Sequence, residues 1–509
     1  MLQPNSILLA WLLVLPFFAA GCALLFPRLA LPVHSEREKA AMAWAPFSLG
    51  ALASLMAVGL AASLWPAVAA GGRVVADYWW TRDLYHLRFQ ADGLSLAAAL
   101  AICAIGGLIH LHLVGLRASG QSHYRAALLL AAQGSGVATV LSADLIALLF
   151  FLGLMLVCLW LLASLGRVRE DTAQPDRGWR AGGLLVAGYV GGLFLAGAAL
   201  LMWQRAGDSS VDALPLLLLS ADPFALRGIA LLTLIGLLPY LCAVPAHGWL
   251  PALLPAGRSA AIAPATLLVI VGTALALRLL AGTLVLGTIP GFYGICVGLG
   301  LLTLCWGALR AWLVRDLAGL AVWLTVAQSG HLLVAVGGSA SPTAPAGLPQ
   351  AGALHLALSP LAVLTIWCVS SAVVARVGTD GLPGLSGLFR RMPLAGLALL
   401  AGGLSLAGLP PLAGFQVQRL LISGLLADQR PALAAVILLA NLLIAAAVLR
   451  AFRRAFLRRE PPPPVAGGSG WLSAQLALLV VALLVPGLWT TPLLGWSETI
   501  FRTALSVSP

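Results

Sequence analysis

The side chains that could carry protons through the apolar parts of this chain are few. Five residues form a candidate polar path: Tyr240, His247, His355, Gln418 and Arg419. A proton path through an apolar interior needs groups that hold and release a proton. Lysine suits this role because desolvation lowers its pKa readily, whereas arginine stays protonated. Only one of the 29 basic residues is a lysine, Lys39, and we expect it in a polar loop.

The sequence offers no other chemical site. Its seven cysteines stand singly in apolar runs, without a C-x-x-C pair, so we expect neither a disulfide framework nor a metal site. We find no nucleotide-binding loop and no feature for binding NADH, flavin, iron–sulfur clusters or quinone, so we predict no cofactor. Any redox chemistry would belong to partner proteins, and membership of an enzyme complex stays open.

The composition predicts the element type that must position these residues. The 509 residues are 61% hydrophobic and 9% charged, with a mean hydropathy of +1.00, which exceeds what a soluble domain can bury. The net charge of +12 comes from basic residues scattered through short loops, which favours a membrane topology over nucleic-acid binding. The chain is therefore expected to be an all-α polytopic membrane protein in contact with the lipid bilayer.

Apolar runs of bilayer-spanning length predict about fourteen helices. Their expected ranges are 6–26, 45–66, 93–116, 126–142, 145–166, 181–204, 228–256, 259–281, 286–309, 317–337, 351–375, 392–427, 432–452 and 471–491. The first run lacks a basic segment before it, so we expect a mature helix rather than a cleaved signal.

Two of these helices are expected to be broken inside the membrane. The seventh contains Pro239, Pro245 and Pro251, and the twelfth contains the segment 408–411 (GLPP). Proline removes a backbone donor and clashes with the preceding turn, so both helices should unwind there. Each break falls in the fourth helix of a group of five, which is the spacing of an inverted repeat.

We therefore divide the chain into four parts. Residues 1–125 hold three N-terminal helices and an extracytoplasmic hairpin, 126–281 the first five-helix repeat, 286–456 the second repeat, and 457–509 a cytoplasmic loop and the C-terminal helix. The segment 71–90 alternates aromatic and β-branched residues, so either a hairpin or an interfacial aromatic belt fits it.

The basic residues also predict the orientation of the chain. They concentrate in the loops that follow odd-numbered helices, so these loops should be cytoplasmic and both termini extracytoplasmic. We expect the location to be a bacterial-type inner membrane.

Four motifs in the expected order resemble one family. Residues 245–251 (PAHGWLP) are similar to the H-x-W-L-P signature of antiporter-like subunits, which occur in respiratory complex I, in Mrp cation antiporters and in membrane hydrogenases. Residues 92–95 (DGLS), 316–317 (DL, where the family has D-x-K) and 408–415 (GLPPLAGF) match further family motifs. The resemblance implies about fourteen helices, outside termini and a path of titrating groups.

Most of those titrating groups are replaced here. By this resemblance, Met155 stands where the family has a glutamate, and lysines are replaced by Tyr240, Ala318, Val363 and Gln418. Arg419 stands where an acid follows the last of these lysines, and of a His–His–Lys set only His355 is kept, followed by Ser359. Residues 261–277 carry no charge. Several sites are lost together, so restoring one would not rebuild a path.

Structural roles compete with a surviving path at each residue. We expect His247 to bond to the unwound backbone, and His355 to bond to a neighbouring carbonyl unless it is functional. Arg419 is taken as the only cation inside a helix, and we expect it to reach the membrane interface or a partner subunit. Gln133, Gln328, Gln418 and Asn441 should join helices, and Asp92, Asp144 and Asp316 should cap helices or pair with arginine. His110 and His112 should face headgroups or water, and 450–459 should be a solvated loop near lipid or a partner.

Three functions remain open. The chain is expected to be a charge-depleted scaffold or anchor, bound to other membrane subunits of a complex related to complex I, rather than a complete proton pump. The first alternative is an active proton- or cation-translocating subunit whose path is rewired through the five candidate residues. The second is an independent transporter, such as one for inorganic carbon with a soluble partner.

Overall fold

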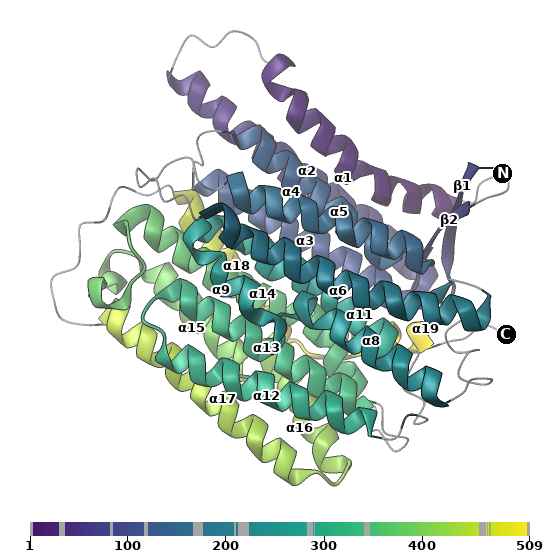
Figure 1. The fold of residues 1–509 in the computed structure, drawn as a ribbon. Helices are drawn as coiled ribbons and strands as arrows, with labels where there is room; N and C mark the ends of the chain where they lie inside the picture. Colours follow the sequence, from purple (N-terminus) through teal and green to yellow (C-terminus); the bar gives the residue numbers. More distant parts are fainter. Residues whose placement is uncertain are drawn as a thin grey trace.

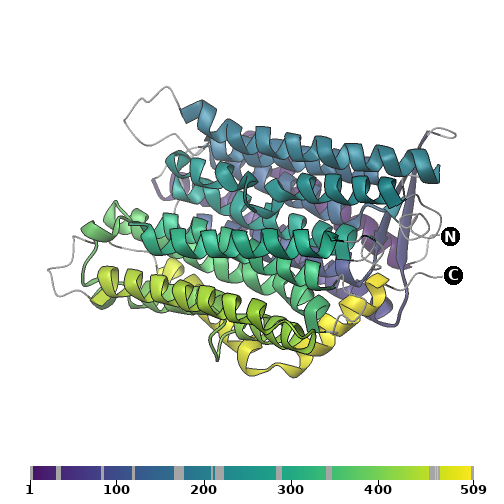
Figure 2. The ribbon, with the colours of Figure 1, turned by 60° about the horizontal axis from the view of Figure 1, so that its bottom comes forward.

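A computed structural model describes most of the chain. The described residues are 4–29, 36–81, 85–116, 121–165, 177–207, 210–211, 223–281, 289, 291–339, 347–457, 465, 467 and 470–505. Long helices run roughly parallel to one another through the molecule (Figure 1 and Figure 2). Both ends of the chain lie at the same end of this bundle, beside a short β-hairpin.

The N-terminal part and the first predicted repeat contain the following elements. They are α1 (Pro4–Leu29), α2 (Glu36–Ala69), β1 (Val74–Thr81), β2 (Tyr85–Ala91), α3 (Gly93–Gly115), α4 (Ser122–Leu141), α5 (Leu145–Leu165), α6 (Arg177–Ala206), α8 (Pro223–Leu241), η2 (Ala246–Gly248), α9 (Trp249–Ala252), η3 (Leu254–Ala256), α10 (Arg258–Ala263), η4 (Pro264–Leu268), α11 (Val269–Ala276) and η5 (Leu277–Ala281). The segments η4 and η5 are π-helical, so the predicted eighth helix is continuous but irregular.

The described part of the remaining chain is also mainly helical. Its elements are α12 (Phe292–Leu313), α13 (Leu317–Ser339), α14 (Gly347–Val377), η6 (Leu382–Gly384), η7 (Leu388–Arg390), α15 (Pro393–Leu406), α16 (Gly414–Ala427), α17 (Pro431–Phe452), η8 (Arg453–Leu457), α18 (Gly470–Leu488) and α19 (Thr491–Leu505).

The expected all-α membrane architecture is confirmed. Among the described residues, twelve helical segments are long and apolar enough to cross a membrane. The other two predicted crossings correspond to α4, which begins with polar residues, and to α15 and α16 together. These two helices have 14 residues each, fewer than the roughly 20 that a bilayer requires, so only the pair spans it.

Both predicted breaks are present, and both begin with the same backbone motif. After α8, the N–H groups of Cys242 and Ala243 bond back to the carbonyls of Pro239 and Leu238. After α15, Gly408 and Leu409 bond in the same way to Ser405 and Leu404. This pattern ends a helix through one residue in the left-handed region, and Cys242 (φ 55°) and Gly408 (φ 73°) occupy that region.

The segment 71–90 forms the predicted hairpin. Strands β1 and β2 pair in antiparallel fashion, with Val74 opposite Ala91, and the chain enters α3 directly afterwards. The hairpin lies at the same end of the bundle as both termini (Figure 1). The side chains of residues 78–86 fall outside the described ones.

Two expectations for polar segments were wrong. α2 begins at Glu36, so Lys39 lies in a helix rather than in a loop, although still before the apolar span. Arg450, Arg453 and Arg454 lie on α17 and η8 rather than in a solvated loop. Arg450 donates a hydrogen bond to the carbonyl of Val314 (2.8 Å). Residues 458–464 lie outside the described part.

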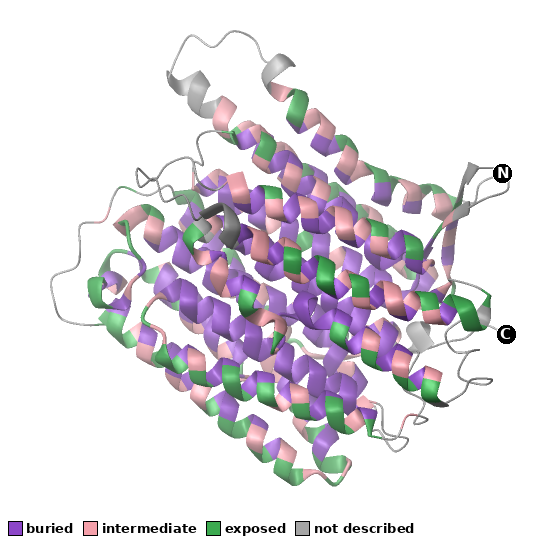
Figure 3. Ribbon diagram, in the orientation of Figure 1, coloured by how far each residue is buried: buried purple, intermediate pink, exposed green. Residues whose placement is uncertain are grey.

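The most buried helices stand at the centre of the bundle. The spans formed by 259–280 and by α13 are buried among other helices, whereas α1, α6 and α17 contain many exposed positions (Figure 3). Large apolar residues occupy many of these exposed positions. In water such exposure would be unfavourable, but lipid tails accept it. His331 on α13 and His355 on α14 therefore lie in the covered part of the bundle. The division of the chain into repeats stays a prediction.

Candidate functional site

Two adjacent residues of α13 bridge the two broken helices. Ser329 Oγ donates a hydrogen bond to the carbonyl of Leu241, where α8 ends. Gln328 Nε2 donates to the carbonyl of Leu406, where α15 ends (3.0 Å). A helix that stops inside an apolar interior leaves carbonyls without partners, and each such group would cost several kcal/mol unpaired. α13 therefore stabilises both breaks at once.

The first break is further held by residues around the PAHGWLP motif. Trp249 Nε1 donates to the carbonyl of Pro239 (2.9 Å), and the N–H of Val244 donates to Thr303 Oγ1 of α12 (3.3 Å). The tryptophan of the motif therefore satisfies the backbone that the neighbouring prolines unwind. This is a structural role, independent of proton transfer.

His247 does not make the expected hydrogen bond to this backbone. It is half-buried, and its Nδ1 atom is buried without a partner in the described part of the chain. Its ring packs on Trp323 of α13, with ring centroids 5.4 Å apart. The guanidinium of Arg310 lies over the same tryptophan, 4.8 Å from the ring centroid. His247 therefore belongs to an aromatic and cationic cluster rather than to the unwound backbone.

A polar chain extends from Gln328 into α14. Ser359 Oγ lies 3.5 Å from Gln328 Oε1 and 2.9 Å from Nδ1 of the buried His355. The tautomer of His355 decides which atom donates in the second contact. His355 is thus satisfied by a side chain rather than by a carbonyl. Val363, one turn further along α14, is buried and ends this polar stripe.

A second polar chain starts from His331, which the sequence analysis did not single out. His331 Nε2 lies 2.9 Å from Asn441 Oδ1 on α17, and Asn441 Nδ2 donates to Gln418 Oε1 on α16 (3.1 Å). His331 stands three residues after Gln328, so both share one face of α13. This three-residue spacing was the sequence signal that could have identified His331 as part of the polar face. Gln328, Gln418 and Asn441 join helices as predicted, and so does Gln133 of α4, whose Oε1 accepts a hydrogen bond from Ser54 Oγ of α2 (2.8 Å).

The corresponding interior around Met155 is apolar. Met155 is fully buried on α5, and its sulfur, Ile102 and Val271 surround the position of Gly136 on α4. Tyr240 is also buried, and its hydroxyl donates to the carbonyl of Gly188 on α6 (2.6 Å). The Tyr240 hydroxyl therefore satisfies backbone rather than a second titrating side chain.

Arg419 and Ala318 lie apart from the two polar chains. Arg419 is exposed on α16 and donates to Gln416 on the same helix (3.0 Å), so it points away from the interior, as its predicted structural role requires. Ala318 is buried at the start of α13, where its N–H donates to Asp380 Oδ2 (3.0 Å).

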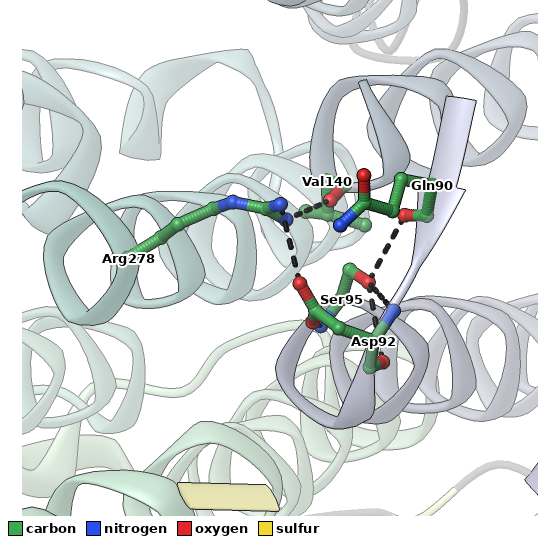
Figure 4. A network of polar contacts seen from close by, with 5 residues as sticks. All are labelled: Gln90, Asp92, Ser95, Val140 and Arg278. Carbon is green, nitrogen blue, oxygen red and sulfur yellow. Dashed lines mark hydrogen bonds and ion pairs between the residues drawn. The ribbon is translucent and has the colours of Figure 1, made fainter. Parts of the chain in front are cut away.

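Arg278 is a further cation inside a membrane helix, so the expectation that Arg419 stands alone was wrong. Its Nη2 atom pairs with Oδ2 of Asp92 at 3.2 Å, and its Nη1 donates to the carbonyl of Val140 at 3.3 Å (Figure 4). The side chains of Arg278 and Asp92 are only 11% and 8% exposed. The predicted arginine pairing of Asp92 is confirmed, because η5 brings Arg278 to the start of α3.

The predicted capping roles are also confirmed. Asp92 Oδ1 accepts from the N–H of Ser95 (2.8 Å), while Ser95 Oγ accepts from the N–H of Asp92 (2.9 Å). Asp144 accepts from the N–H of Ile146 (2.7 Å), and Asp316 accepts from the N–H of Gly319. These aspartates therefore hold the starts of α3, α5 and α13.

His110 and His112 do not face headgroups or water, contrary to expectation. Both are fully buried on α3. His112 Nδ1 lies 2.9 Å from Gln475 Oε1 of α18, and its Nε2 contacts Ser371 Oγ of α14. Helix α18 therefore covers the end of α3 that the sequence suggested was open.

Comparison with known proteins identifies the matching family. Residues 142–447 match the model described as NADH:quinone oxidoreductase/Mrp antiporter, TM. The chain is 32% identical to NADH-quinone oxidoreductase subunit N of Cereibacter sphaeroides, over 68% of this chain and 72% of that protein. It is 28% identical to the A/B subunit of a probable K(+)/H(+) antiporter of Rhizobium meliloti, over 80% of this chain. The match spans only 39% of that longer antiporter protein.

A solved structure has the same fold. A chain in the Mrp complex from Dietzia sp. DQ12-45-1b superposes with a TM-score of 0.85 at 20% identity, covering 100% of this chain and 98% of that one.

Proposed function

Because this chain belongs to the membrane-subunit family of NADH:quinone oxidoreductases and Mrp antiporters, we propose that it is a scaffold or anchor rather than a complete proton pump. It would sit in a multisubunit membrane complex, with other membrane subunits as its partners. We further propose that its termini are extracytoplasmic in a bacterial-type inner membrane, as the distribution of arginines favours.

One observation carries this proposal: the interior around Met155 is packed with apolar side chains, and the Tyr240 hydroxyl bonds to a backbone carbonyl. A relay through this half would need titrating groups at both places. The motifs that remain, such as Trp249 and Asp92, bond to backbone at the breaks and helix starts. The residues that hold the fold are kept, whereas the titrating groups that the resemblance implies are missing. This combination supports a subunit that assembles into a complex but does not pump.

The test is ion flux through the purified chain in proteoliposomes. We expect no uncoupler-sensitive proton or sodium flux, and we expect the chain to copurify with other membrane subunits from its native membrane. A flux that His355→Ala abolishes, but that the matched surface variant Arg419→Ala leaves intact, would overturn the proposal.

The polar chains of α13 and α14 favour one second candidate, a translocating subunit with a rewired path. His331 and His355 are buried and hydrogen-bonded, and bound waters could connect their chains. In that case flux should depend on both histidines, so that His331→Ala and His355→Ala each abolish it. Flux that survives both changes would point instead to an independent transporter.

A further inference from the structure

A cavity lies where α18 meets the last turns of α14 and the first turn of α15. Its volume is about 80 Å³, and its lining includes Arg376, Arg391, Leu394, Leu472 and Ser473. Arg376 stands in the last turn of α14, and Arg391 lies two residues before Pro393, the first residue of α15. The α14–α15 connection is at the end of the bundle opposite to the termini (Figure 1).

The charge of this cavity is positive. Two of the residues that line it are arginines, and none of the described lining residues is acidic. The Nε atom of Arg376 is buried without a hydrogen-bond partner among the described residues. Arg391 makes no ion pair with them either. A buried donor on a charged group is costly to leave unpaired, so this site favours an anion.

Two further groups suit an anion with several acceptor oxygens. α15 begins at Pro393, so its first turn, with Leu394 and Ala395, lines the cavity and adds the partial positive charge of a helix N-terminus. Ser473 of α18 supplies a hydroxyl donor. Arginine forks match phosphate oxygens in particular.

We propose that this cavity binds a phosphate group, supplied by the headgroup of an anionic phospholipid or by free phosphate. A basic pocket between helices at a membrane surface is typical of phospholipid headgroup sites. By the predicted orientation, the pocket faces the cytoplasmic leaflet, which carries anionic lipid. The bound phosphate would join α14, α15 and α18, next to the contact of His112 with Gln475.

The experiment uses the full chain, purified in detergent and stripped of lipid. Wild type, Arg376→Gln and Arg391→Gln are compared with Arg390→Gln, which removes the same charge from an exposed residue outside the lining. Binding of dioleoylphosphatidylglycerol and of inorganic phosphate is measured separately by native mass spectrometry and by the shift in thermal unfolding temperature. Dioleoylphosphatidylcholine serves as the zwitterionic reference.

We expect each of Arg376→Gln and Arg391→Gln to weaken binding about five-fold or more, and Arg390→Gln to leave it unchanged. Binding of phosphatidylglycerol that inorganic phosphate does not displace would assign the group to a lipid; binding of inorganic phosphate alone would assign it to the free ion. Equal binding in all four proteins, an equal loss in Arg390→Gln, or no binding of either probe would overturn the proposal. Arg391 is exposed, so its variant keeps the test valid should Arg376→Gln fail to fold.

Discussion

The interiors of the segments α4–α11 and α12–α17 differ in polarity. Around Met155, the first interior is lined by Ile102 and Val271, and the Tyr240 hydroxyl bonds to a backbone carbonyl. The second interior contains two chains of hydrogen-bonded side chains, one centred on His331 of α13 and the other on His355 of α14. Neither segment has the lysines that the family resemblance implies. Their interiors nevertheless differ in how many hydrogen-bonded polar side chains they contain.

This difference shows two ways in which the interior of this fold is filled without lysine. In the first segment, the side chains that meet beside Met155 are apolar, so no charged or hydrogen-bonding group stands there. In the second, neutral polar groups bond to one another across helices, which keeps the helices joined without a fixed charge.

The largest expected effect tests the buried ion pair that borders the apolar segment. Arg278→Gln should lower the free energy of unfolding by about 3–5 kcal/mol, because Asp92 is then left buried without its counter-charge. The double variant Arg278→Gln/Asp92→Asn should recover part of this loss, since asparagine still caps α3. Thermal unfolding in detergent measures both. A double variant no more stable than Arg278→Gln alone would contradict this.

The second prediction places a carboxylate back in the apolar interior. Met155→Glu should cost about 2.5–3.5 kcal/mol of stability, because a charge buried among apolar side chains has no counter-charge, and it should not create proton flux. Met155→Gln is the control for size and should cost less. Proteoliposome flux and unfolding temperature are the measurements. Unchanged stability together with new flux would show that the two interiors do not differ as described.

A smaller effect is expected in the polar interior. Asn441→Leu should destabilise the chain by about 1–2 kcal/mol, since it leaves His331 and Gln418 buried without their shared partner. Replacing His331, Asn441 and Gln418 together by leucine should be less damaging than the single change, because no orphaned group remains. Unfolding temperatures of the two variants decide the matter; the reverse order would mean that these contacts are not coupled.

The smallest effect is expected at Arg419. Arg419→Gln should change the free energy of unfolding by no more than about 0.5 kcal/mol, because the side chain is exposed on α16 and outside both interiors. Chemical or thermal denaturation of the purified chain measures this. A loss above about 2 kcal/mol would place Arg419 inside the polar segment after all.

Local features of the fold were predictable from sequence. Prolines and glycine located both breaks, and Asp92 followed by Ser95 located the start of α3, because these residues act on backbone within a few positions. The polar residues Gln328 and Asn441 were correctly expected to join helices. The positions where the family has titrating side chains, such as Met155 and Tyr240, were located by matching family motifs rather than by residue spacing.

Contacts between distant helices were not predictable in the same way. Arg278 and Asp92, or His112 and Gln475, meet only because particular helices pack together. In a membrane protein the lipid-facing and protein-facing sides of a helix are both apolar, so hydrophobic periodicity does not identify the buried face. For this reason His112 was wrongly expected in water, and the contact of His331 with Asn441 was not foreseen.

The bridge that α13 makes between the two breaks has a mechanical consequence. Gln328 and Ser329 are neighbours on one rigid, fully covered helix, and each holds the end of a different broken helix. A shift of α13 by one helical turn, about 5.4 Å, would release both ends together. The two breaks are therefore coupled through one helix, so any displacement of α13 along its axis acts on both of them together.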